Sequence, residues 1–148
     1  MCLSRTTATN HDFQALVKLL DADLKLRDGD EHAFFSQYNT IDSINNVLVL
    51  YINNVLVGCG AFKMYDKQKV EIKRMYVLED FRGKGIAQAI LKELESWAKQ
   101  IGYQNCILET GKKQPEAIRL YEKSGCRYIP NYGQYEKTEN SVCFEKVL

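Results

Sequence analysis

The chain has 148 residues, of which 45% are hydrophobic and 26% charged, and its formal net charge is +1. A chain of this length and composition typically folds as one globular domain, so we expect a single domain over residues 1–148. The balanced net charge argues against a nucleic-acid-binding protein, which normally has a strongly basic face, and no apolar run reaches the ~18 residues that span a membrane. We therefore expect neither a nucleic-acid nor a membrane partner.

The cysteines favour a reducing compartment. Their number is odd, and they form neither a CxxC pair nor a cluster with histidine; they are Cys2, Cys59, Cys106, Cys126 and Cys143. Disulfide frameworks and zinc sites need paired spacings, so we expect reduced thiols and no metal. The first ten residues lack the apolar stretch of a signal peptide, and we expect a cytoplasmic protein.

The N-terminal part predicts a strand and then a helix. Residues 1–8 suit a short edge strand, and Asn10 or Asp12 can cap the helix that follows. The apolar residues of that helix recur on one face; they are Phe13, Leu16, Val17, Leu20 and Leu24. The polar stretch 28–46 predicts a second short helix with loops.

An acidic segment lies at the end of this first helix. Between Asp21 and Glu31 there are five acids against two bases, Lys25 and Arg27. The segment is either a solvated helix end or a rim that draws a cationic substrate toward a site. The sequence leaves both interpretations open.

The middle of the chain changes to strand patterning. Residues 47–52 and 55–64 are rich in β-branched and apolar side chains. The Asn53-Asn54 pair between them suits a tight hairpin turn, because asparagine tolerates positive φ. After a charged turn, residues 70–77 predict a third antiparallel strand.

The remainder alternates helices and strands. Helical spacing returns after Gly85 and ends before Gly102, and Pro115 opens another helix that ends at Gly125. Three further strands are predicted at residues 106–108, from Tyr128, and at 141–147. The resulting order, β-α-α-β-β-β-α-β-α-β-β, predicts an α/β (α+β) fold with a mixed sheet.

Residues 71–87 contain the most chemical information, because a strand passes through a glycine-rich turn into a helix. Gly83 and Gly85 let the backbone approach a ligand closely and leave N–H groups pointing outward. Together with the helix dipole, these groups form an anion site suited to a pyrophosphate. Arg82 and Lys84 add positive charge at the same place.

Two other pyrophosphate motifs fit less well. The GxxxxGK[ST] pattern of nucleoside triphosphate sites is absent, and the Rossmann pattern lacks its third glycine, where Gln88 stands. Glu109, 24 residues after Gly85, lies near the place of a ribose-binding acid, so a Rossmann-type domain remains the runner-up. About eighty residues that include an antiparallel hairpin precede the turn, which argues against it.

The segment Arg82-x-x-Gly85-x-Ala87 resembles the (Q/R)xxGx(G/A) motif of the GNAT superfamily of N-acetyltransferases. The context agrees, with residues 75–77 before the motif and Ala117-Ile-x-x-Tyr121-Glu-Lys-x-Gly125 after it, and the resemblance covers about residues 47–148. It implies a GNAT fold, in which a central, mixed and mostly antiparallel sheet is flanked by helices. It also implies acetyl-CoA as the co-substrate.

The resemblance implies which residues bind this co-substrate. The strand backbone at Met75, Tyr76 and Val77 would pair with the pantetheine arm. The turn would hold the pyrophosphate with Arg82, Gly83, Lys84, Gly85, Ile86 and Ala87. Two positions depart from the family pattern: Gln114 stands where asparagine often opens the second helix and contacts the CoA arm, and Cys126 replaces a phenylalanine of the core.

Acetylation of an amine needs a base, because alkylamines are protonated at neutral pH. Glu71 holds the place of the catalytic glutamate of histone-acetylating relatives. Strand alternation predicts that Glu71 shares one face with Lys73, Met75 and Val77. This placement suits a base in the site, but it is equally compatible with a buried ion pair.

The departing thiolate needs a proton. Tyr121 matches the tyrosine that supplies it in many relatives, and the alternative is a core aromatic residue. The loop 129–135 bears two tyrosines, Tyr132 and Tyr135. This loop either covers the acceptor pocket or is a plain surface hairpin.

We therefore predict an acetyl-CoA-dependent N-acetyltransferase that acts on a primary amine of a small molecule or protein, by direct attack in a ternary complex. The alternatives are a non-catalytic acyl-CoA-binding module and, less favoured, a Rossmann-type nucleotide-binding domain. A homodimer is compatible with this prediction. The sequence does not identify the amine.

Overall fold

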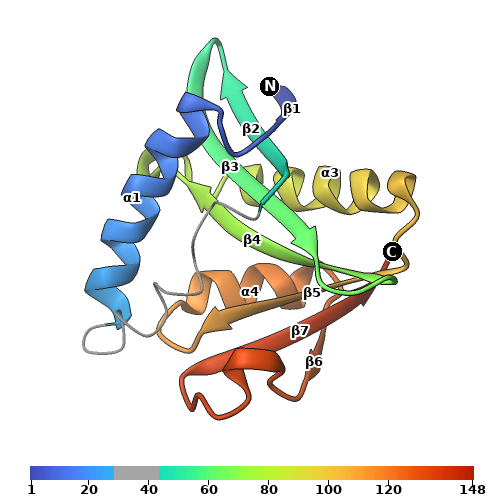
Figure 1. Cartoon of the computed structure of the whole chain (residues 1–148). Helices are drawn as coiled ribbons and strands as arrows, with labels where there is room; N and C mark the ends of the chain where they lie inside the picture. Colours follow the sequence, from blue (N-terminus) through green and yellow to red (C-terminus); the bar gives the residue numbers. More distant parts are fainter. Residues whose placement is uncertain (29–43) are drawn as a thin grey trace.

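The fold is a seven-stranded sheet with helices on both faces (Figure 1). It comes from a computed structural model that describes residues 1–28 and 44–148. The strands lie in the order β1-β2-β3-β4-β5-β7-β6. Their bounds are Cys2–Thr6, Asn46–Ile52, Val55–Met64, Lys69–Val77, Asn105–Gly111, Arg127–Ile129 and Ser141–Val147 for β1 to β7. Three helices of eight residues or more are described: α1, His11–Asp28; α3, Ile86–Ile101; and α4, Pro115–Lys123.

The predicted fold class is confirmed, and the described elements follow the predicted order. Asn10 caps α1, because its side-chain Oδ1 accepts a hydrogen bond from the backbone N–H of Phe13 at 2.9 Å. Asn53 and Asn54 form the hairpin turn with φ of 50° and 65°. The second short helix predicted within residues 28–46 falls outside the described residues.

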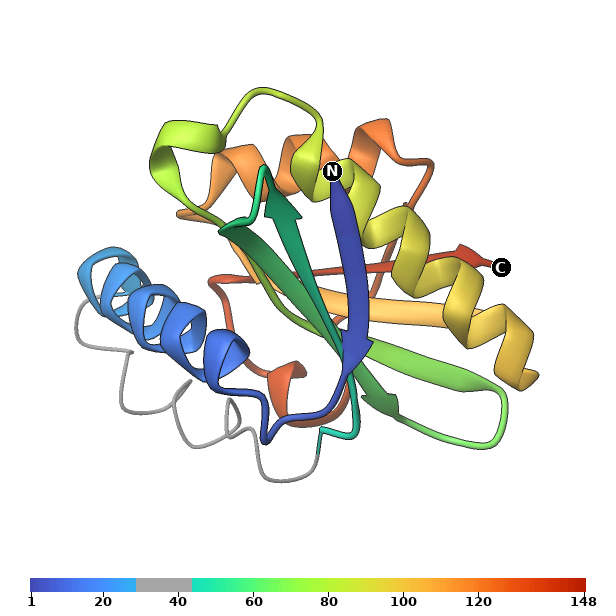
Figure 2. The ribbon, with the colours of Figure 1, turned by 90° about the horizontal axis from the view of Figure 1, so that it is seen from above.

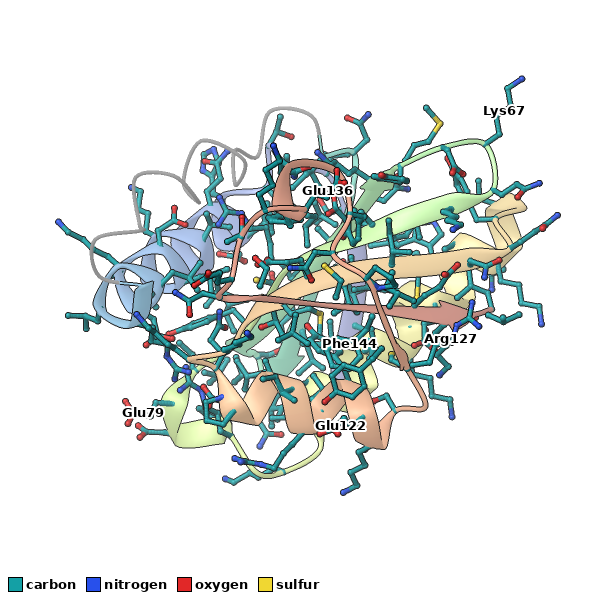
Figure 3. The ribbon with its side chains drawn as sticks, turned by 90° about the horizontal axis from the view of Figure 1, so that it is seen from below. Lys67, Glu79, Glu122, Arg127, Glu136 and Phe144 are labelled. Atoms are coloured by element: carbon teal, nitrogen blue, oxygen red, sulfur yellow. The ribbon has the colours of Figure 1, made fainter. Side chains whose placement is uncertain are left out.

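The two faces of the sheet have separate cores. The view from above shows α1 on one side of the sheet and α3 on the other (Figure 2). On one face, α3 and α4 pack on the strands through a cluster that includes Ile90, Leu94, Tyr121 and Phe144. On the other face, α1 packs through Phe13, Leu16 and Val17 against β2 and β3. In Figure 3, Phe144 lies inside the molecule, whereas Lys67, Glu79 and Glu122 lie at its periphery.

A glycine in β3 lets α3 lie close to the sheet. A Cβ atom added at Gly60 would stand 2.7 Å from Ile90 Cγ2 and 2.8 Å from Leu94 Cδ1, both on α3. It would also stand 2.7 Å from Met75 Sδ. A side chain at position 60 would therefore force these side chains, or α3 itself, to shift.

A β-bulge interrupts β4 and corrects one prediction. Cys59 pairs with Tyr76, whereas Ala61 pairs with Lys73, so β4 has an extra residue where β3 advances by two. Arg74 lies in the bulge with φ of 59°. A bulge shifts the alternation of side chains by one residue.

The shared face predicted for residues 71–77 is therefore wrong in part. Met75 and Val77 pack into the core beneath α3. Glu71 and Lys73 lie on the opposite face, where they contact Tyr132 and Tyr135. The prediction assumed that side chains alternate between the two faces along the whole strand, but this alternation is interrupted at the bulge.

Strands β4 and β5 form the parallel pair at the centre of the sheet, and they diverge along their length. They pair only over Lys69–Glu71 and Asn105–Ile107. The remaining pairings of the described strands are antiparallel. Beyond Glu71 and Ile107, both strands continue without a ladder between them, which opens the centre of the sheet.

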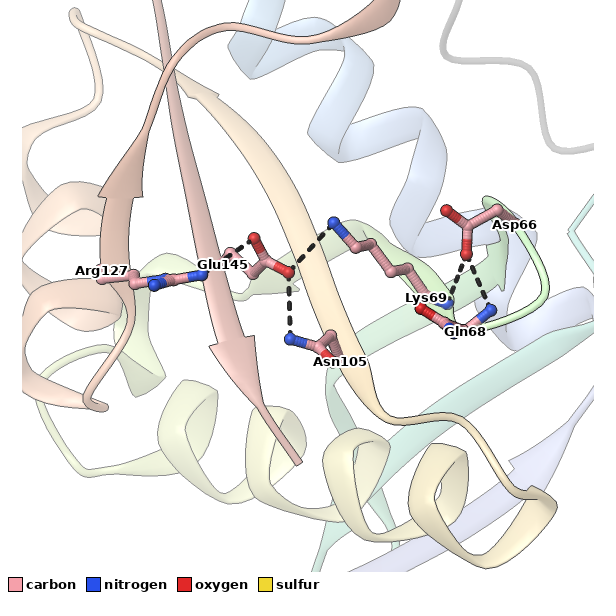
Figure 4. A network of polar contacts seen from close by, with 6 residues as sticks. All are labelled: Asp66, Gln68, Lys69, Asn105, Arg127 and Glu145. Atoms are coloured by element: carbon pink, nitrogen blue, oxygen red, sulfur yellow. Dashed lines mark hydrogen bonds and ion pairs between the residues drawn. The ribbon is translucent and has the colours of Figure 1, made fainter.

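A polar cluster holds the closed end of this divergence (Figure 4). Glu145 of β7 accepts a hydrogen bond from Asn105 Nδ2 at 3.0 Å and pairs with Lys69 Nζ at 3.2 Å. Arg127 of β6 reaches the other carboxylate oxygen at 3.4 Å. One carboxylate thus joins β4, β5, β6 and β7 at the end opposite the opening.

Candidate functional site

The opening between β4 and β5 forms part of a cavity of about 410 Å³. Its walls come from β4, β5, the turn before α3, α4 and the C-terminal half of α1. Of the predicted site residues, the cavity brings together Glu71, Met75, Tyr76, Val77, Arg82, Gly83, Gly85, Ile86, Ala87, Gln114 and Tyr121. Lys84 is the predicted residue that does not line it.

The turn before α3 has the backbone of an anion site. Gly83 and Gly85 have φ of 77° and 80°, a conformation that is costly for residues with a Cβ. Gly85 is the N-cap of α3, and no side chain bonds to the first N–H groups of the helix. These groups and the positive end of the helix dipole face the cavity mouth, where a Cβ at Gly85 would meet nothing within 4 Å.

The two cations of the turn have different positions. Arg82 donates from Nε to the carbonyl oxygen of Val77 at 2.9 Å and lies over the ring of Tyr76 at 5.4 Å, so it joins the turn to the end of β4. Lys84 Nζ lies 5.4 Å from the ring centre of Phe81. Arg82 is thus the cation that the fold fixes at the cavity.

The wall near the predicted pantetheine position is the unpaired part of β4. Met75, Tyr76 and Val77 line the cavity beyond the last residue paired with β5. Backbone groups on this side of the strand have no partner strand and are available to an extended ligand. The carbonyl of Val77 is the exception, because Arg82 occupies it.

The opening residue of α4 also lies in the cavity wall. Gln114 is the N-cap of α4 and makes no side-chain capping bond, so its amide is not used by the helix. Cys126, at the other departure from the family pattern, is buried in the core shared with Tyr121. The first departure therefore bears on the cavity and the second on packing.

Tyr121 lies on α4 with its ring in the core and is 5% exposed. The ring stacks at a tilt on Phe144, with centroids 5.7 Å apart. Burial raises the pKa of the hydroxyl above its usual value of 10.0. Tyr121 is therefore protonated throughout the neutral range, which is the state needed to donate a proton.

Glu71 is buried and also lines the cavity, and the loop after β6 reaches it. Its Oε2 accepts a hydrogen bond from the Tyr132 hydroxyl at 2.7 Å. Burial, and then the nearby charge of Glu71, raise the pKa of Tyr132, so this hydroxyl stays a donor. Tyr135, in the short 3-10 helix Gly133–Tyr135, lines the cavity. The geometry favours the interpretation that this loop covers the pocket over that of a plain surface hairpin.

Several charged residues of the cavity were not among the predicted site residues, and three of them lie on β4 and β5. Lys73 donates to the Tyr135 hydroxyl at 3.3 Å, and burial lowers its pKa. Arg74 pairs with Asp21 of α1 at 2.7 Å. Glu109 of β5 accepts a hydrogen bond from Ser141 at 2.7 Å. A positive φ at an arginine cannot be predicted from the sequence, because glycine is the residue that usually marks this conformation. The sequence therefore did not reveal the bulge that places Arg74 in the cavity wall.

The acidic segment is partly neutralised. Asp21 pairs with Arg74, and Asp23 pairs with Arg27 at 3.2 Å. Arg27 also pairs with Glu116 in the first turn of α4, so α1 is tied to α4 beside the cavity. Asp30 and Glu31 lie outside the described residues. The described acids thus serve partly as counter-ions of arginines.

Neither a metal cluster nor a membrane-spanning helix is found within residues 1–28 and 44–148. No group of three or more His, Cys, Asp or Glu side chains is arranged to hold a metal ion. No helix in these ranges is both long and apolar enough to cross a bilayer.

The Rossmann alternative is wrong. In the strand order, β4 lies between an antiparallel β3 and a parallel β5, and the sheet is not doubly wound. Glu109, which suggested a ribose-binding acid, instead bonds to Ser141 of β7.

Comparisons with known proteins agree with this fold. The curated N-acetyltransferase YsnE of Bacillus subtilis (strain 168), itself uncharacterized, is 36% identical over 95 residues, or 63% of this chain and 63% of that protein. The chain thus spans less than two thirds of the length of this relative.

Two crystal structures superpose over nearly the whole chain. A protein of Klebsiella pneumoniae subsp. pneumoniae MGH 78578, named as an acyl-CoA N-acyltransferase, has a TM-score of 0.83 at 28% identity, and covers 99% of this chain and 97% of that one. A GNAT family acetyltransferase of Elizabethkingia anophelis with acetyl-CoA bound has a TM-score of 0.72 at 23% identity, with 99% and 97% covered. The second likeness shows the fold.

The family assignment rests on a match along most of the chain. A model of the acetyltransferase (GNAT) family matches residues 13–126, from the first helix to the end of α4 and the cysteine that follows. This span contains the glycine turn, Glu71 and Tyr121. The chain belongs to the acetyltransferase (GNAT) family.

Proposed function

We propose that the protein is an acetyl-CoA-dependent N-acetyltransferase that transfers the acetyl group directly to a primary amine in a ternary complex. The observation that supports this most is a single cavity that extends from the capless N-terminus of α3, past the unpaired edge of β4, to Glu71 and Tyr121. The related fold of the Elizabethkingia anophelis protein, which has acetyl-CoA bound, supports the choice of co-substrate.

The residues present fit this co-substrate. The N–H groups around Gly83 and Gly85 and the charge of Arg82 would hold the pyrophosphate, and the free backbone of β4 would hold the pantetheine arm. Acetyl-CoA supplies an acetyl group that is activated as a thioester. The chain then has to supply an acceptor site and two proton transfers.

Glu71 would accept the proton of the ammonium group. A protonated amine has no lone pair, so a base must act before attack on the carbonyl. Glu71 is a buried carboxylate in the cavity, and the Tyr132 hydroxyl fixes one of its oxygens. A water molecule between Glu71 and the amine could carry the proton to the carboxylate.

Tyr121 would donate a proton to the departing sulfur. Its raised pKa keeps the hydroxyl protonated, and α4 holds it in the wall of the cavity. The predicted acid and base thus lie on different elements, α4 and β4, on either side of the opening.

Direct transfer is favoured over an acyl-enzyme. The described residues of the cavity wall include no cysteine, serine or histidine. Burial raises the pKa of Cys59 and of Cys106 to about 12, so these thiols are not ionised nucleophiles at neutral pH.

The test is a calorimetric titration with acetyl-CoA, followed by release of free thiol in the presence of an amine library. We expect binding of acetyl-CoA and thiol release that depends on one class of amine. Binding without thiol release from any amine would instead support the non-catalytic acyl-CoA-binding module. Absence of binding would contradict both.

A further inference from the structure

The β4 bulge places an incompletely paired guanidinium in the cavity. The Arg74 side chain is 4% exposed, and within residues 1–28 and 44–148 its only ion pair joins Nη1 to Asp21, a carboxylate that is itself 48% exposed. The Arg74 Nε atom is buried and has no hydrogen-bond partner among the described residues. Because an unpaired buried donor is costly, this arrangement suggests that a ligand completes it.

The atom of Arg74 that pairs with Asp21 determines which of its N–H groups remain for a ligand. In a guanidinium, Nε and Nη2 lie on the same side and present two parallel N–H groups, and the contact with Asp21, which is made by Nη1, does not use this side. Two parallel donors match the two oxygens of a carboxylate. Lys73, the neighbouring residue, is a second basic side chain in the cavity wall.

The backbone supports a role for this position. A residue other than glycine at φ of 59° is strained, yet the bulge is held by the buried Cys59 thiol, which donates to the Arg74 carbonyl oxygen at 3.4 Å. The bulge brings Lys73 and Arg74 to the same side of the strand, where both line the cavity. Glu71 and Glu109 line the same cavity, so positive and negative groups lie together in its wall.

We propose that the acceptor is an amino acid, with its carboxylate bound by the Nε–Nη2 side of Arg74 and its amino group directed to Glu71. This inference rests on the proposed function and narrows its substrate class. A polyamine or an amino sugar would leave the Arg74 donors without a partner. A zwitterionic acceptor matches both charges of the pocket.

The first experiment compares each free amino acid with its primary amide, at saturating acetyl-CoA, by thiol release. We expect the free acid of the accepted amino acid to have a kcat/KM ~10–100-fold above that of its amide, as for a charge-assisted bidentate contact. The amine of the amide loses its proton more easily, so the chemistry alone would favour the amide. Equal or better use of the amide would overturn the proposal.

The second experiment substitutes the arginine. Arg74→Gln should raise the KM for the free acid ~10–100-fold, leave the amide and the KM for acetyl-CoA unchanged, and so abolish the preference. Arg74→Lys keeps the positive charge but lacks the two parallel donors, so it should retain only part of the preference for the free acid. Arg119→Gln, at an exposed position of α4 outside the cavity wall, is the matched control and should behave as the wild type.

Failure of the proposed function can be told apart from failure of this inference. If no amine releases thiol, titration of the CoA-saturated protein with N-acetyl amino acids and with their amides still tests the carboxylate site. Tighter binding of the acids, lost in Arg74→Gln, would support it. An increased KM for acetyl-CoA in Arg74→Gln, with the preference for acids retained, would assign the arginine to the co-substrate and overturn the proposal.

Discussion

Single side chains around the cavity are held in states that suit acid–base chemistry. Burial keeps the Tyr121 hydroxyl protonated, and the Tyr132 hydroxyl fixes the Glu71 carboxylate. The two groups act on different protons, one on the amine and the other on the sulfur. Their loss should therefore affect the rate in different ways.

Tyr121→Phe tests the proton donor. The ring and its contact with Phe144 are kept, so we expect an unchanged melting temperature and an unchanged affinity for acetyl-CoA. Loss of a positioned acid typically costs ~10²–10⁴ in rate, and we expect kcat to fall at least ~10-fold. Steady-state kinetics under conditions where chemistry limits the rate provide the measurement. A near-normal kcat would make Tyr121 a core aromatic residue.

Glu71→Gln tests the base and keeps the size of the side chain. We expect kcat/KM to fall by ~10²–10⁴ near neutral pH. The deficit should narrow as the pH rises, because more of the amine is then already deprotonated in solution. A pH–rate profile of both proteins measures this. A deficit of the same size at every pH would indicate a structural role for Glu71 instead.

At the scale of elements, the N-terminus of α3 is the part of the site that depends on backbone groups. Gly85→Glu places a negative side chain at the anion position, and we expect loss of acetyl-CoA binding in calorimetry. A Cβ there meets nothing within 4 Å, so the cost to the fold is the left-handed conformation, roughly 1–2 kcal/mol.

Gly125→Glu is the matched control for this change. Gly125 has φ of 88°, close to the 80° of Gly85, but lies after α4 and outside the cavity wall. It should lose similar stability and retain acetyl-CoA binding. Unchanged affinity in Gly85→Glu would contradict the assignment of the pyrophosphate to this turn.

The contact of α3 with β3 has its own prediction. Gly60→Ala forces a Cβ to within 2.8 Å of three side-chain atoms, and overpacking of this kind costs ~1–3 kcal/mol. Chemical denaturation should show this loss. A Gly60→Ala protein with the stability of the wild type would mean that α3 can move away freely.

For the molecule as a whole, the buried thiols predict a loss of stability at alkaline pH. Burial raises the pKa of Cys59 and of Cys106 from 9.0 to about 12 in the folded state. Above pH 9 the unfolded chain therefore releases protons that the folded chain keeps, and the free energy of unfolding falls. Each thiol contributes a slope of about 1.4 kcal/mol per pH unit between these values.

Denaturation curves from pH 8 to 10.5 measure this effect. Stability should be maximal below pH 9. In Cys59→Ala, the slope of the free energy of unfolding against pH should decrease by the contribution of about one proton. The same change should lower stability at neutral pH, because packing around the thiol is lost. The lowered pKa of Lys73 acts in the opposite direction, but one amine cannot offset two thiols. A free energy of unfolding that stays constant across this range would contradict the burial of the thiols.

The sequence by itself determined the family, the fold class and the order of the described elements. These features depend on local signals: apolar spacing sets helices and strands, Asn53-Asn54 sets a turn, and Gly83 and Gly85 mark an anion site at a helix N-terminus. The residues of the turn are neighbours in the chain, so their role can be predicted without knowledge of the rest of the fold. Lys84 shows the limit, because the direction of a side chain depends on what it packs against, here the Phe81 ring.

Only the tertiary structure decided which side chains meet in the cavity. The bulge at Arg74 reverses the alternation of β4, and its carbonyl is held by Cys59 from the neighbouring strand. Glu71 and Tyr132 are 61 positions apart, and Arg74 and Asp21 are 53 apart. Such contacts arise from the packing of distant elements, whose free energy no local pattern encodes. The pairing of β4 with β5 is likewise confined to the end of the strands where Glu145 of β7 contacts both Lys69 and Asn105.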